Sequence, residues 1–254
     1  MKYDELARVT ENREFTAGYR YLTMEAPKQA AEMVPGQFVH VRVPTLEDSA
    51  LRRPFSVFNA ADGKVTVLYK TVGRGTAALS KVKEGECVRL MGPLGRGFPA
   101  KCDGTALLVG GGFGVAPLHF LAKRLPKSIL FVGGRTKDDL LAVDKFEAMG
   151  VEVKVSTNDG SRGFKGFVTG PLDETINELR AKGEKFELFT CGPDGLLKAV
   201  TERALALKVP GWISVDRHMI CGMGACFACI QKTVRGNSRC CIEGPVFKAE
   251  ELVW

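Results

Sequence analysis

The segment "CGMGACFAC" (residues 221–229) places three cysteines close together, with small residues between them. The spacing C-x4-C-x2-C, followed by a more distant cysteine, is that of plant-type [2Fe–2S] ferredoxins. Gly222, Gly224 and Ala225 allow the backbone to fold tightly around inorganic sulfide, because glycine adopts dihedral angles that other residues avoid. The pattern therefore predicts a [2Fe–2S] site with three ligands from this segment: Cys221, Cys226 and Cys229.

The fourth ligand of such a site must come from elsewhere, and the adjacent pair Cys240 and Cys241 offers two candidates. The spacing does not choose between them. Zinc is the alternative metal, but zinc sites usually combine two short pairs of ligands, whereas here three thiols stand on one side and an adjacent pair on the other. The pattern therefore favours an iron–sulfur cluster over zinc.

The chain of 254 residues contains no apolar run of the length needed to cross a membrane. Its first residues, "MKYDELARVT", lack the apolar stretch of a signal peptide. We therefore expect a cytoplasmic protein that does not enter a membrane. Thiols stay reduced in that compartment, where clustered cysteines bind metal more often than they pair.

The hydrophobic pattern changes along the chain. Short alternating segments such as "FVHVRV" (38–43) and "VTVLY" (65–69), separated by Gly/Pro turns, indicate an antiparallel sheet or barrel. From about residue 104, buried strands alternate with helical patterns, beginning with "ALLV" (106–109) and the amphipathic "VAPLHFLAKRL" (115–125). This order predicts a parallel sheet with crossover helices. Further strand candidates are 129–132, 151–155, 186–190 and 212–215.

The predicted fold class is a multi-module α+β chain. We expect an antiparallel β-barrel in residues 1–98, a parallel α/β domain in residues 99–211 and a small C-terminal [2Fe–2S] module in residues 212–254. After "WISV" (212–215) we expect no return to regular periodicity.

Two neighbouring segments of the barrel, "RRPFSVFN" (52–59) and "LYKTVGRGT" (68–76), suit a flavin. Arginine pairs with phosphate, and a hydroxyl can hydrogen-bond a flavin ring. The second segment adds an aromatic ring for stacking, a lysine, and a Gly-Thr pair for a pyrophosphate. Each segment alone is also compatible with an ordinary turn, but together they predict a flavin site. The candidate residues are Arg53, Pro54, Ser56, Tyr69, Lys70, Gly75 and Thr76.

Glycines between a strand and a helix in "GGGFG" (110–114) allow a phosphate to approach the helix N-terminus, which predicts a nicotinamide-dinucleotide site. The segment departs from G-x-G-x-x-G at Val115, and no acidic residue lies about 20 residues on to hold ribose hydroxyls. Arg135 and Lys137 are candidates for a 2′-phosphate, so the choice between NADH and NADPH stays open. The candidate glycines are Gly110, Gly111, Gly112 and Gly114.

A second part of this site is expected in "CGP", Cys191, Gly192 and Pro193, directly after a predicted strand. In open α/β sheets, ligands gather at the carboxyl ends of strands. Cys191 is therefore a candidate contact for the nicotinamide ring. The alternative is a buried structural cysteine before a helix that begins with proline.

The formal net charge of +7 does not indicate nucleic-acid binding. The basic residues are scattered, without a stripe interleaved with aromatic residues. A cluster on four thiolates and a flavin dinucleotide would each add about −2, which brings the charge to roughly +3.

No catalytic acid or base is predicted. His40, His119 and His218 form no recognisable constellation, and we expect His119 to be a surface or core residue. The pair Asp138 and Asp139 is typical of a helix start.

These motifs follow one another over nearly the whole chain, and in this order the chain resembles the iron–sulfur flavoprotein subunits of NAD-dependent dihydroorotate dehydrogenases, within the ferredoxin-reductase superfamily. The combination of "MGPLGRGF" (91–98) with the cysteine segment and "GPVF" (244–247) is the most specific part. One departure is that residues 55–58, Phe-Ser-Val-Phe, are bulkier than the aliphatic residues of the family's pattern.

The resemblance implies FAD in the barrel, NAD in the α/β domain and a [2Fe–2S] cluster in the tail. The flavin contacts that it implies are Arg53, Pro54, Phe55, Ser56, Leu68, Tyr69, Lys70, Gly75 and Thr76. In the family's pattern the last cluster ligand stands three residues before Gly-Pro-Val-Phe, and that residue is Cys241 here. The resemblance further implies electron transfer between NAD(H) and an FMN-containing dihydroorotate dehydrogenase catalytic subunit in pyrimidine biosynthesis. The implied assembly is a heterotetramer with two copies of each chain.

Two other functions remain open from the sequence. A related reductase subunit for a sulfite reductase, a hydrogenase or a ferredoxin would share every cofactor and differ in its partner. A zinc-stabilised binding module would have no redox activity.

Overall fold

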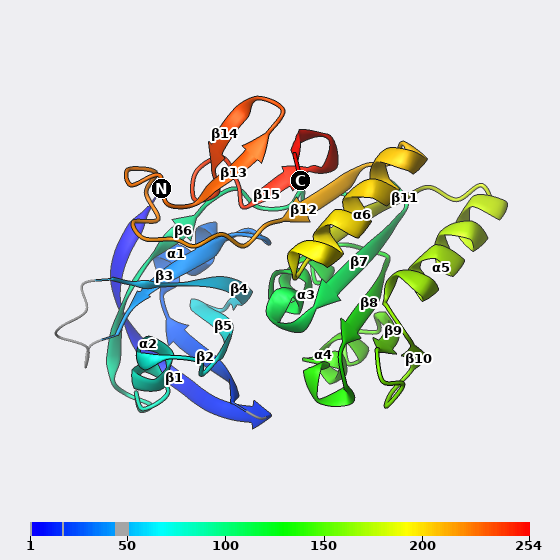
Figure 1. The fold of residues 1–254 in the computed structure, drawn as a ribbon. Helices are drawn as coiled ribbons and strands as arrows, with labels where there is room; N and C mark the ends of the chain where they lie inside the picture. The colour runs from blue at the N-terminus through cyan, green and yellow to red at the C-terminus, as the bar shows by residue number, and fades with distance from the viewer. Residues whose placement is uncertain (1, 17, 44–50) are drawn as a thin grey trace.

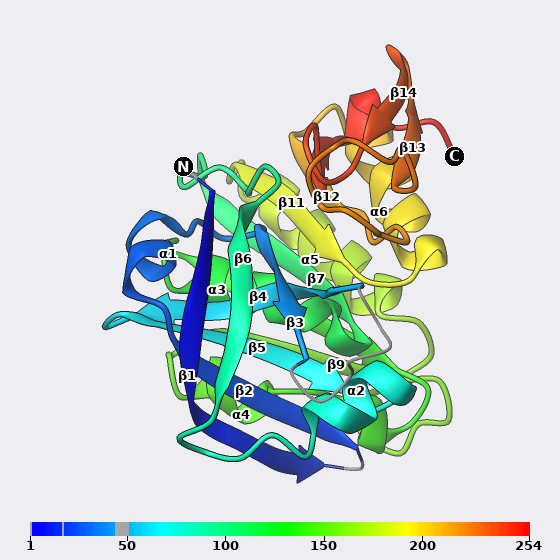
Figure 2. The ribbon, with the colours of Figure 1, turned by 90° about the vertical axis from the view of Figure 1, so that its left-hand side faces the viewer.

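The computed structural model describes residues 2–16, 18–43 and 51–254. A barrel and an α/β unit lie side by side, and the C-terminal segment crosses the same end of both (Figure 1, Figure 2). Among the described residues, no helix has both the length and the apolar character needed to cross a membrane.

The first unit is a closed antiparallel barrel with the strand order β1-β2-β5-β4-β3-β6. Its strands alternate, so that inward-facing residues such as Val39, Val67 and Leu90 are fully buried in the barrel interior. The predicted barrel is confirmed. Its elements are β1 (Tyr3–Thr16), β2 (Tyr19–Glu25), α1 (Pro27–Glu32), β3 (Phe38–Arg42), β4 (Arg53–Ala61), β5 (Lys64–Lys70), α2 (Arg74–Leu79) and β6 (Cys87–Leu94).

The second unit is a sheet with the order β10-β9-β8-β7-β11-β12-β15, parallel except for β15. Both faces of β7 are buried: Leu107 and Val109 pack with α5 and α6, whereas Ala106 and Leu108 pack with α3 and α4. The elements are β7 (Thr105–Gly111), η1 (Gly112–Gly114), α3 (Val115–Ala122), β8 (Ser128–Gly134), η2 (Lys137–Asp139), α4 (Val143–Glu147), β9 (Glu152–Thr157), β10 (Phe164–Lys165), α5 (Thr169–Ala181), β11 (Phe186–Cys191), α6 (Asp194–Leu207) and β12 (Gly211–Ser214).

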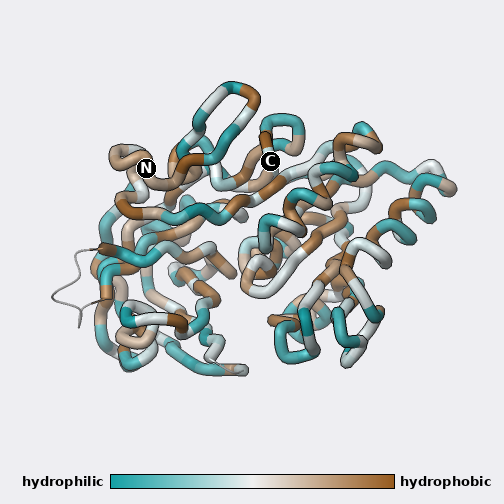
Figure 3. The backbone as a smooth tube through the Cα atoms, viewed as in Figure 1, coloured by the Kyte–Doolittle hydropathy of each residue, from teal (hydrophilic) through white to brown (hydrophobic). Residues whose placement is uncertain are grey.

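The helices cover this sheet because each presents an apolar face to it. In α5 the buried residues recur at helical spacing, and hydrophobic and hydrophilic stretches alternate along the helix in Figure 3. The predicted parallel sheet with crossover helices is therefore confirmed.

The expectation that regular structure ends after residue 215 is wrong. β13 (Ile230–Thr233) and β14 (Gly236–Arg239) form a hairpin, and β15 (Val246–Lys248) pairs antiparallel with β12. These strands are too short for a period-two pattern to be recognised in the sequence. The boundary predicted between residues 211 and 212 falls inside β12, which is a full member of the α/β sheet.

The two most specific sequence motifs pack against each other. The Arg96 N–H donates to the Gly244 carbonyl at 2.5 Å, and the Val215 N–H donates to the Pro245 carbonyl at 3.0 Å. A Cβ at Gly95 would lie 2.5 Å from Pro245 Cδ. The contact between Gly95 and Pro245 thus joins the barrel to the C-terminal segment. One hydrophobic core runs through all three parts of the chain.

The barrel and the α/β unit also meet at α3. The His119 ring stacks on Phe58, with 3.8 Å between ring centroids, and its Nδ1 lies 3.0 Å from the Phe58 carbonyl oxygen. His119 is therefore a core residue, and burial lowers its pKa to about 4, so that the ring is neutral at pH 7. The bulky Phe58 side chain, from the barrel, therefore packs in the interface with the α/β unit.

We predict that Gly95→Ala lowers the free energy of unfolding by about 3 kcal/mol, because it adds both a clash and an alanine in a left-handed conformation. Gly95 has φ +74°, and its neighbours are proline and backbone atoms that cannot move aside. Gly85→Ala is the matched control, since φ is +87° there but nothing lies within 4 Å. It should lose only about 1 kcal/mol in denaturant titration, and equal losses would contradict the packing argument.

Candidate functional site

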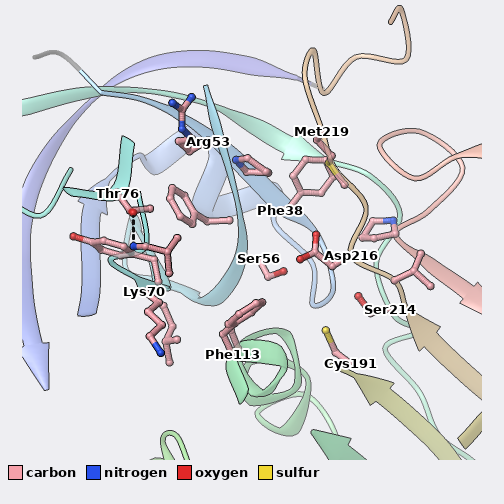
Figure 4. A pocket seen from close by; sticks show the side chains of 18 residues that line it. Phe38, Arg53, Ser56, Lys70, Thr76, Phe113, Cys191, Ser214, Asp216 and Met219 are labelled. Atoms are coloured by element: carbon pink, nitrogen blue, oxygen red, sulfur yellow. Dashed lines mark hydrogen bonds between the residues drawn. The ribbon is translucent and has the colours of Figure 1, made fainter. Parts of the chain in front are cut away.

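A cavity of about 270 Å³ lies between the barrel and the α/β unit, and we call it the barrel cavity (Figure 4). Most residues predicted to hold FAD come together here from β4, β5 and α2. They are Arg53, Pro54, Phe55, Ser56, Leu68, Tyr69, Lys70 and Thr76. Gly75 does not line the cavity but lies directly beneath the Arg53 side chain.

Gly75 is required by the position of Arg53. A Cβ at Gly75 would lie 2.3 Å from Arg53 Nε, so only glycine allows the guanidinium to cross the start of α2. The Thr76 hydroxyl accepts the N–H groups of Val72 at 2.8 Å and Gly73 at 3.2 Å, and therefore holds the turn in shape. A cation beside a tight backbone turn suits a pyrophosphate.

The opposite wall of the barrel cavity comes from the α/β unit. Ser214 and Asp216, at and beyond the end of β12, stand across from Ser56 and beside Cys191 (Figure 4). The sequence analysis missed both, together with Phe38, Phe113 and five other lining residues. The position of Ser214 at the carboxyl end of a parallel strand is a signal that points to it. The others are Val72, Ala116, Val215, Met219 and Pro245.

Cys191 is buried, and desolvation raises its pKa to about 12, although a hydrogen bond with Ser214 acts in the opposite direction. The thiol is therefore neutral at pH 7. It offers the cavity a small, polarisable surface and no nucleophile.

A second cavity, which we call the glycine cavity, opens at the carboxyl ends of β7, β8 and β11. Gly111, Gly112 and Pro193 line it, as expected for a dinucleotide site. Gly110, Gly114 and Gly192 do not line it and serve close packing instead. For example, a Cβ at Gly114 would lie 2.2 Å from the Cys191 carbonyl oxygen.

The glycine cavity also contains an acidic group that the sequence analysis set aside. Asp139 lines it, accepts the Arg135 backbone N–H at 3.1 Å and lies 3.4 Å from the Arg135 Nε. Arg135 lines the cavity too, whereas Lys137 is not among its lining residues. The two cavities adjoin, because Gly112 lines one and the next residue, Phe113, lines the other.

The four predicted cluster ligands meet as two pairs of thiols. Cys221 and Cys226 lie within hydrogen-bonding range of each other, and so do Cys229 and Cys241. Desolvation acts to raise the pKa of Cys221, but N–H groups of the loop, including Met223 at 3.4 Å, lower it to about 6. Donors aimed at sulfur suit a thiolate ligand.

The loop takes this shape because of its glycines. Gly222 has φ +66° and Gly224 has φ +80°, and both are left-handed conformations. The Gly224 carbonyl accepts a hydrogen bond from Arg239 Nη1 at 3.1 Å, and Arg239 is held in turn by Glu243. The loop is thereby fixed onto the hairpin.

The surroundings distinguish the adjacent thiols. Cys241 receives the Gly224 N–H and meets Cys229, so it faces the interior of the loop. Cys240 also interacts with Cys229, but Arg217 and Asp216 act on it as well, and its backbone N–H donates to the Cys229 carbonyl at 2.8 Å. Burial raises the pKa of both thiols.

The donor set fits a binuclear cluster better than a single zinc ion. Within residues 2–16, 18–43 and 51–254, no three His, Cys, Asp or Glu side chains converge tightly enough for one metal ion. A zinc ion draws four ligands around one centre at about 2.3 Å for sulfur. Two thiol pairs instead match two irons with two thiolates each.

Comparisons with known proteins identify two of the three parts of the chain. Residues 7–98 match the oxidoreductase FAD-binding domain, and residues 216–253 match the iron–sulfur cluster binding domain of dihydroorotate dehydrogenase B. The electron transfer subunit of dihydroorotate dehydrogenase B (NAD(+)) from Desulforamulus reducens is 38% identical over 92% of both chains. That from Lysinibacillus sphaericus is 39% identical over 96% of both.

A solved structure of an NADH-dependent reduced ferredoxin-NADP oxidoreductase is also similar. It superposes with a TM-score of 0.84 and 30% identity, and the match covers 98% of this chain and 90% of that one.

We predict that Cys241→Ser removes the bound iron of the purified chain and the cluster's contribution to its visible absorbance, so that only the flavin contribution is left, whereas Cys240→Ser retains both. The reason is that Cys241 interacts with both Cys229 and Cys221 and receives the Gly224 N–H, whereas Cys240 also interacts with Arg217 and Asp216 outside the loop. Iron and sulfide analysis together with the absorption spectrum decides the matter. The opposite result would show that Cys240 is the fourth ligand.

Proposed function

Because the chain belongs to the family of dihydroorotate dehydrogenase B electron transfer subunits, we propose that it transfers electrons between an FMN-containing dihydroorotate-oxidising partner and NAD⁺. One observation carries this proposal: the three sites are contiguous. The glycine cavity adjoins the barrel cavity at Phe113, and Met219 lines the barrel cavity two residues before Cys221.

Each site has side chains suited to one cofactor. Arg53 would pair with the FAD pyrophosphate, Tyr69 and Phe55 would border the rest of the molecule, and Ser56 would donate to the ring. Gly111 and Gly112 would admit the pyrophosphate of NAD(H). When bound, FAD exchanges a hydride with NAD(H) and the [2Fe–2S] cluster carries single electrons. The ligands of that cluster are Cys221, Cys226, Cys229 and Cys241.

The protein contributes position and exclusion of water. Phe38, Phe113 and Met219 are apolar walls of the barrel cavity, and Phe38 and Met219 are buried. An apolar wall disfavours water beside a bound group. The buried thiol of Cys191 is neutral and adds no charge where the two cavities adjoin.

We infer that the base for dihydroorotate oxidation is not provided by this chain. Oxidation of that substrate requires a group that removes a proton from carbon while hydride leaves. The barrel, the α/β unit and the cysteine segment are each used by one cofactor. We therefore assign dihydroorotate to the partner. We propose that the two chains form a cytoplasmic heterotetramer, with two copies of each, and that the complex serves pyrimidine biosynthesis.

The partner would dock on an apolar surface beside the cluster loop. Met223 and Phe227 are 56% and 62% exposed, and Ile220 lies next to them with 38%. Phe227 is held outward by a left-handed backbone, with φ 57°, and by Arg239, whose guanidinium lies 5.2 Å from the ring centroid. Exposed apolar groups of this kind mark protein interfaces.

We predict that the isolated chain reduces artificial acceptors with NADH but produces no orotate. Adding an FMN-containing dihydroorotate-oxidising subunit should give NAD⁺-linked turnover. Phe227→Asp should lower that turnover at least tenfold at limiting partner and leave the NADH–acceptor rate unchanged.

Val234→Asp is the control, because Val234 is 68% exposed on the β13–β14 turn, away from this surface. Orotate formed by the chain alone would contradict the assignment. Turnover with a ferredoxin, and none with the dihydroorotate-oxidising subunit, would favour the reductase alternative.

We further predict a preference for NADH that depends on Asp139. Its carboxylate in the glycine cavity repels a 2′-phosphate by about 1–4 kcal/mol. Asp139→Ser should therefore raise kcat/KM for NADPH relative to NADH by about tenfold. Asp138→Ser, a neighbouring change outside the cavity, should leave the ratio unchanged, and equal effects of the two variants would exclude this role for Asp139.

A further inference from the structure

His40 lies beneath the loop that begins at Cys221. It stands in β3, and its side chain is fully buried. A Cβ at Gly222 would lie 2.9 Å from His40 Cε1 and 3.1 Å from both Nδ1 and Nε2. These three atoms form the nitrogen-bearing edge of the imidazole, so this edge faces the cysteine loop.

Neither ring nitrogen of His40 has a hydrogen-bond partner in the described part of the chain. Buried polar atoms are nearly always paired. Burial, with a smaller contribution from Arg52, lowers the pKa of His40 to about 4, so the neutral ring carries one N–H donor at pH 7. The donor therefore points to an acceptor outside the described part of the chain, and a group bound in the cysteine loop would supply one.

The ring also fills the space between two sites. Phe38 lies on the same face of β3, with 5.6 Å between its ring centroid and that of His40, and it lines the barrel cavity. Pro54, opposite His40 in the β3–β4 ladder, lines that cavity as well. His40 thus has the barrel cavity on one side and the cysteine loop on the other.

We propose that the His40 ring donates a hydrogen bond to sulfur at the Cys221 corner of the [2Fe–2S] cluster and thereby raises the reduction potential of the cluster. This inference rests on the cluster site of the proposed function. A hydrogen bond to cluster sulfur favours the reduced form, because that form carries more negative charge. His40 is a positioning residue that tunes the cluster and does not ligate it.

Pulsed electron spin resonance of the dithionite-reduced holoprotein, labelled with ¹⁵N-histidine, tests the contact. We expect a weak coupling from one histidine nitrogen, which His40→Phe abolishes and His218→Gln retains. His218 is the control because it is exposed and stands three residues before Cys221. No histidine coupling in the wild type, or a coupling that survives in His40→Phe, would overturn the proposal.

A redox titration tests the consequence. At a fixed ambient potential, His40→Phe should lower the ratio of reduced to oxidised cluster about tenfold, which is 59 mV for a one-electron couple. His40→Gln keeps an N–H donor and should restore most of the ratio. If the ratio of reduced to oxidised cluster is unchanged in a His40→Phe variant with full iron content, His40 only packs against the loop and the proposal is wrong.

If the His40→Phe variant does not retain its cluster, the proposal is judged on the labelled protein that still has His40. A histidine coupling that persists in His218→Gln supports it, and the absence of any histidine coupling overturns it. A wild-type chain that purifies without iron would contradict the cluster site itself, so the two failures are distinguishable.

Discussion

The contact between Gly95–Arg96 and Gly244–Pro245 is the constraint on which the arrangement of the chain depends. It fixes the end of the barrel to the segment that leads into β15, and β15 in turn pairs with β12 of the α/β sheet. Without this junction the cysteine segment would still be held to the α/β unit, through β12 and the ion pair between Arg217 and Asp194, but it would lose its backbone hydrogen bond to the barrel. With it, the cluster ligands share one core with both larger units.

A second feature of the interior is that three of its buried titratable groups are neutral. Burial lowers the pKa of His40 and His119 and raises that of Cys191, so each is uncharged at pH 7. An isolated charge in such surroundings is strongly destabilising. These three side chains therefore add no charge beside the sites proposed for the cofactors, and the protein contributes position and orientation.

The sequence by itself determined the features that depend on neighbouring residues. A continuous apolar run such as 106–109 predicted a strand that is buried on both faces. An alternating run such as 65–69 predicted a strand that is buried on one face. The spacing of Cys221, Cys226 and Cys229 predicted the cluster loop because the ligands are close together in sequence. The glycines between them indicate the local backbone conformation. The barrel and the parallel sheet followed from these patterns.

Only the tertiary structure decided which residues meet across the chain. It separated Gly111 and Gly112, which line a cavity, from Gly110 and Gly114, which only allow close packing. It brought Asp216 opposite Ser56, and it placed His40 beneath Gly222. Such contacts join residues far apart in sequence, and no local pattern records them, because they arise only when β3, β12 and the cysteine loop are packed together.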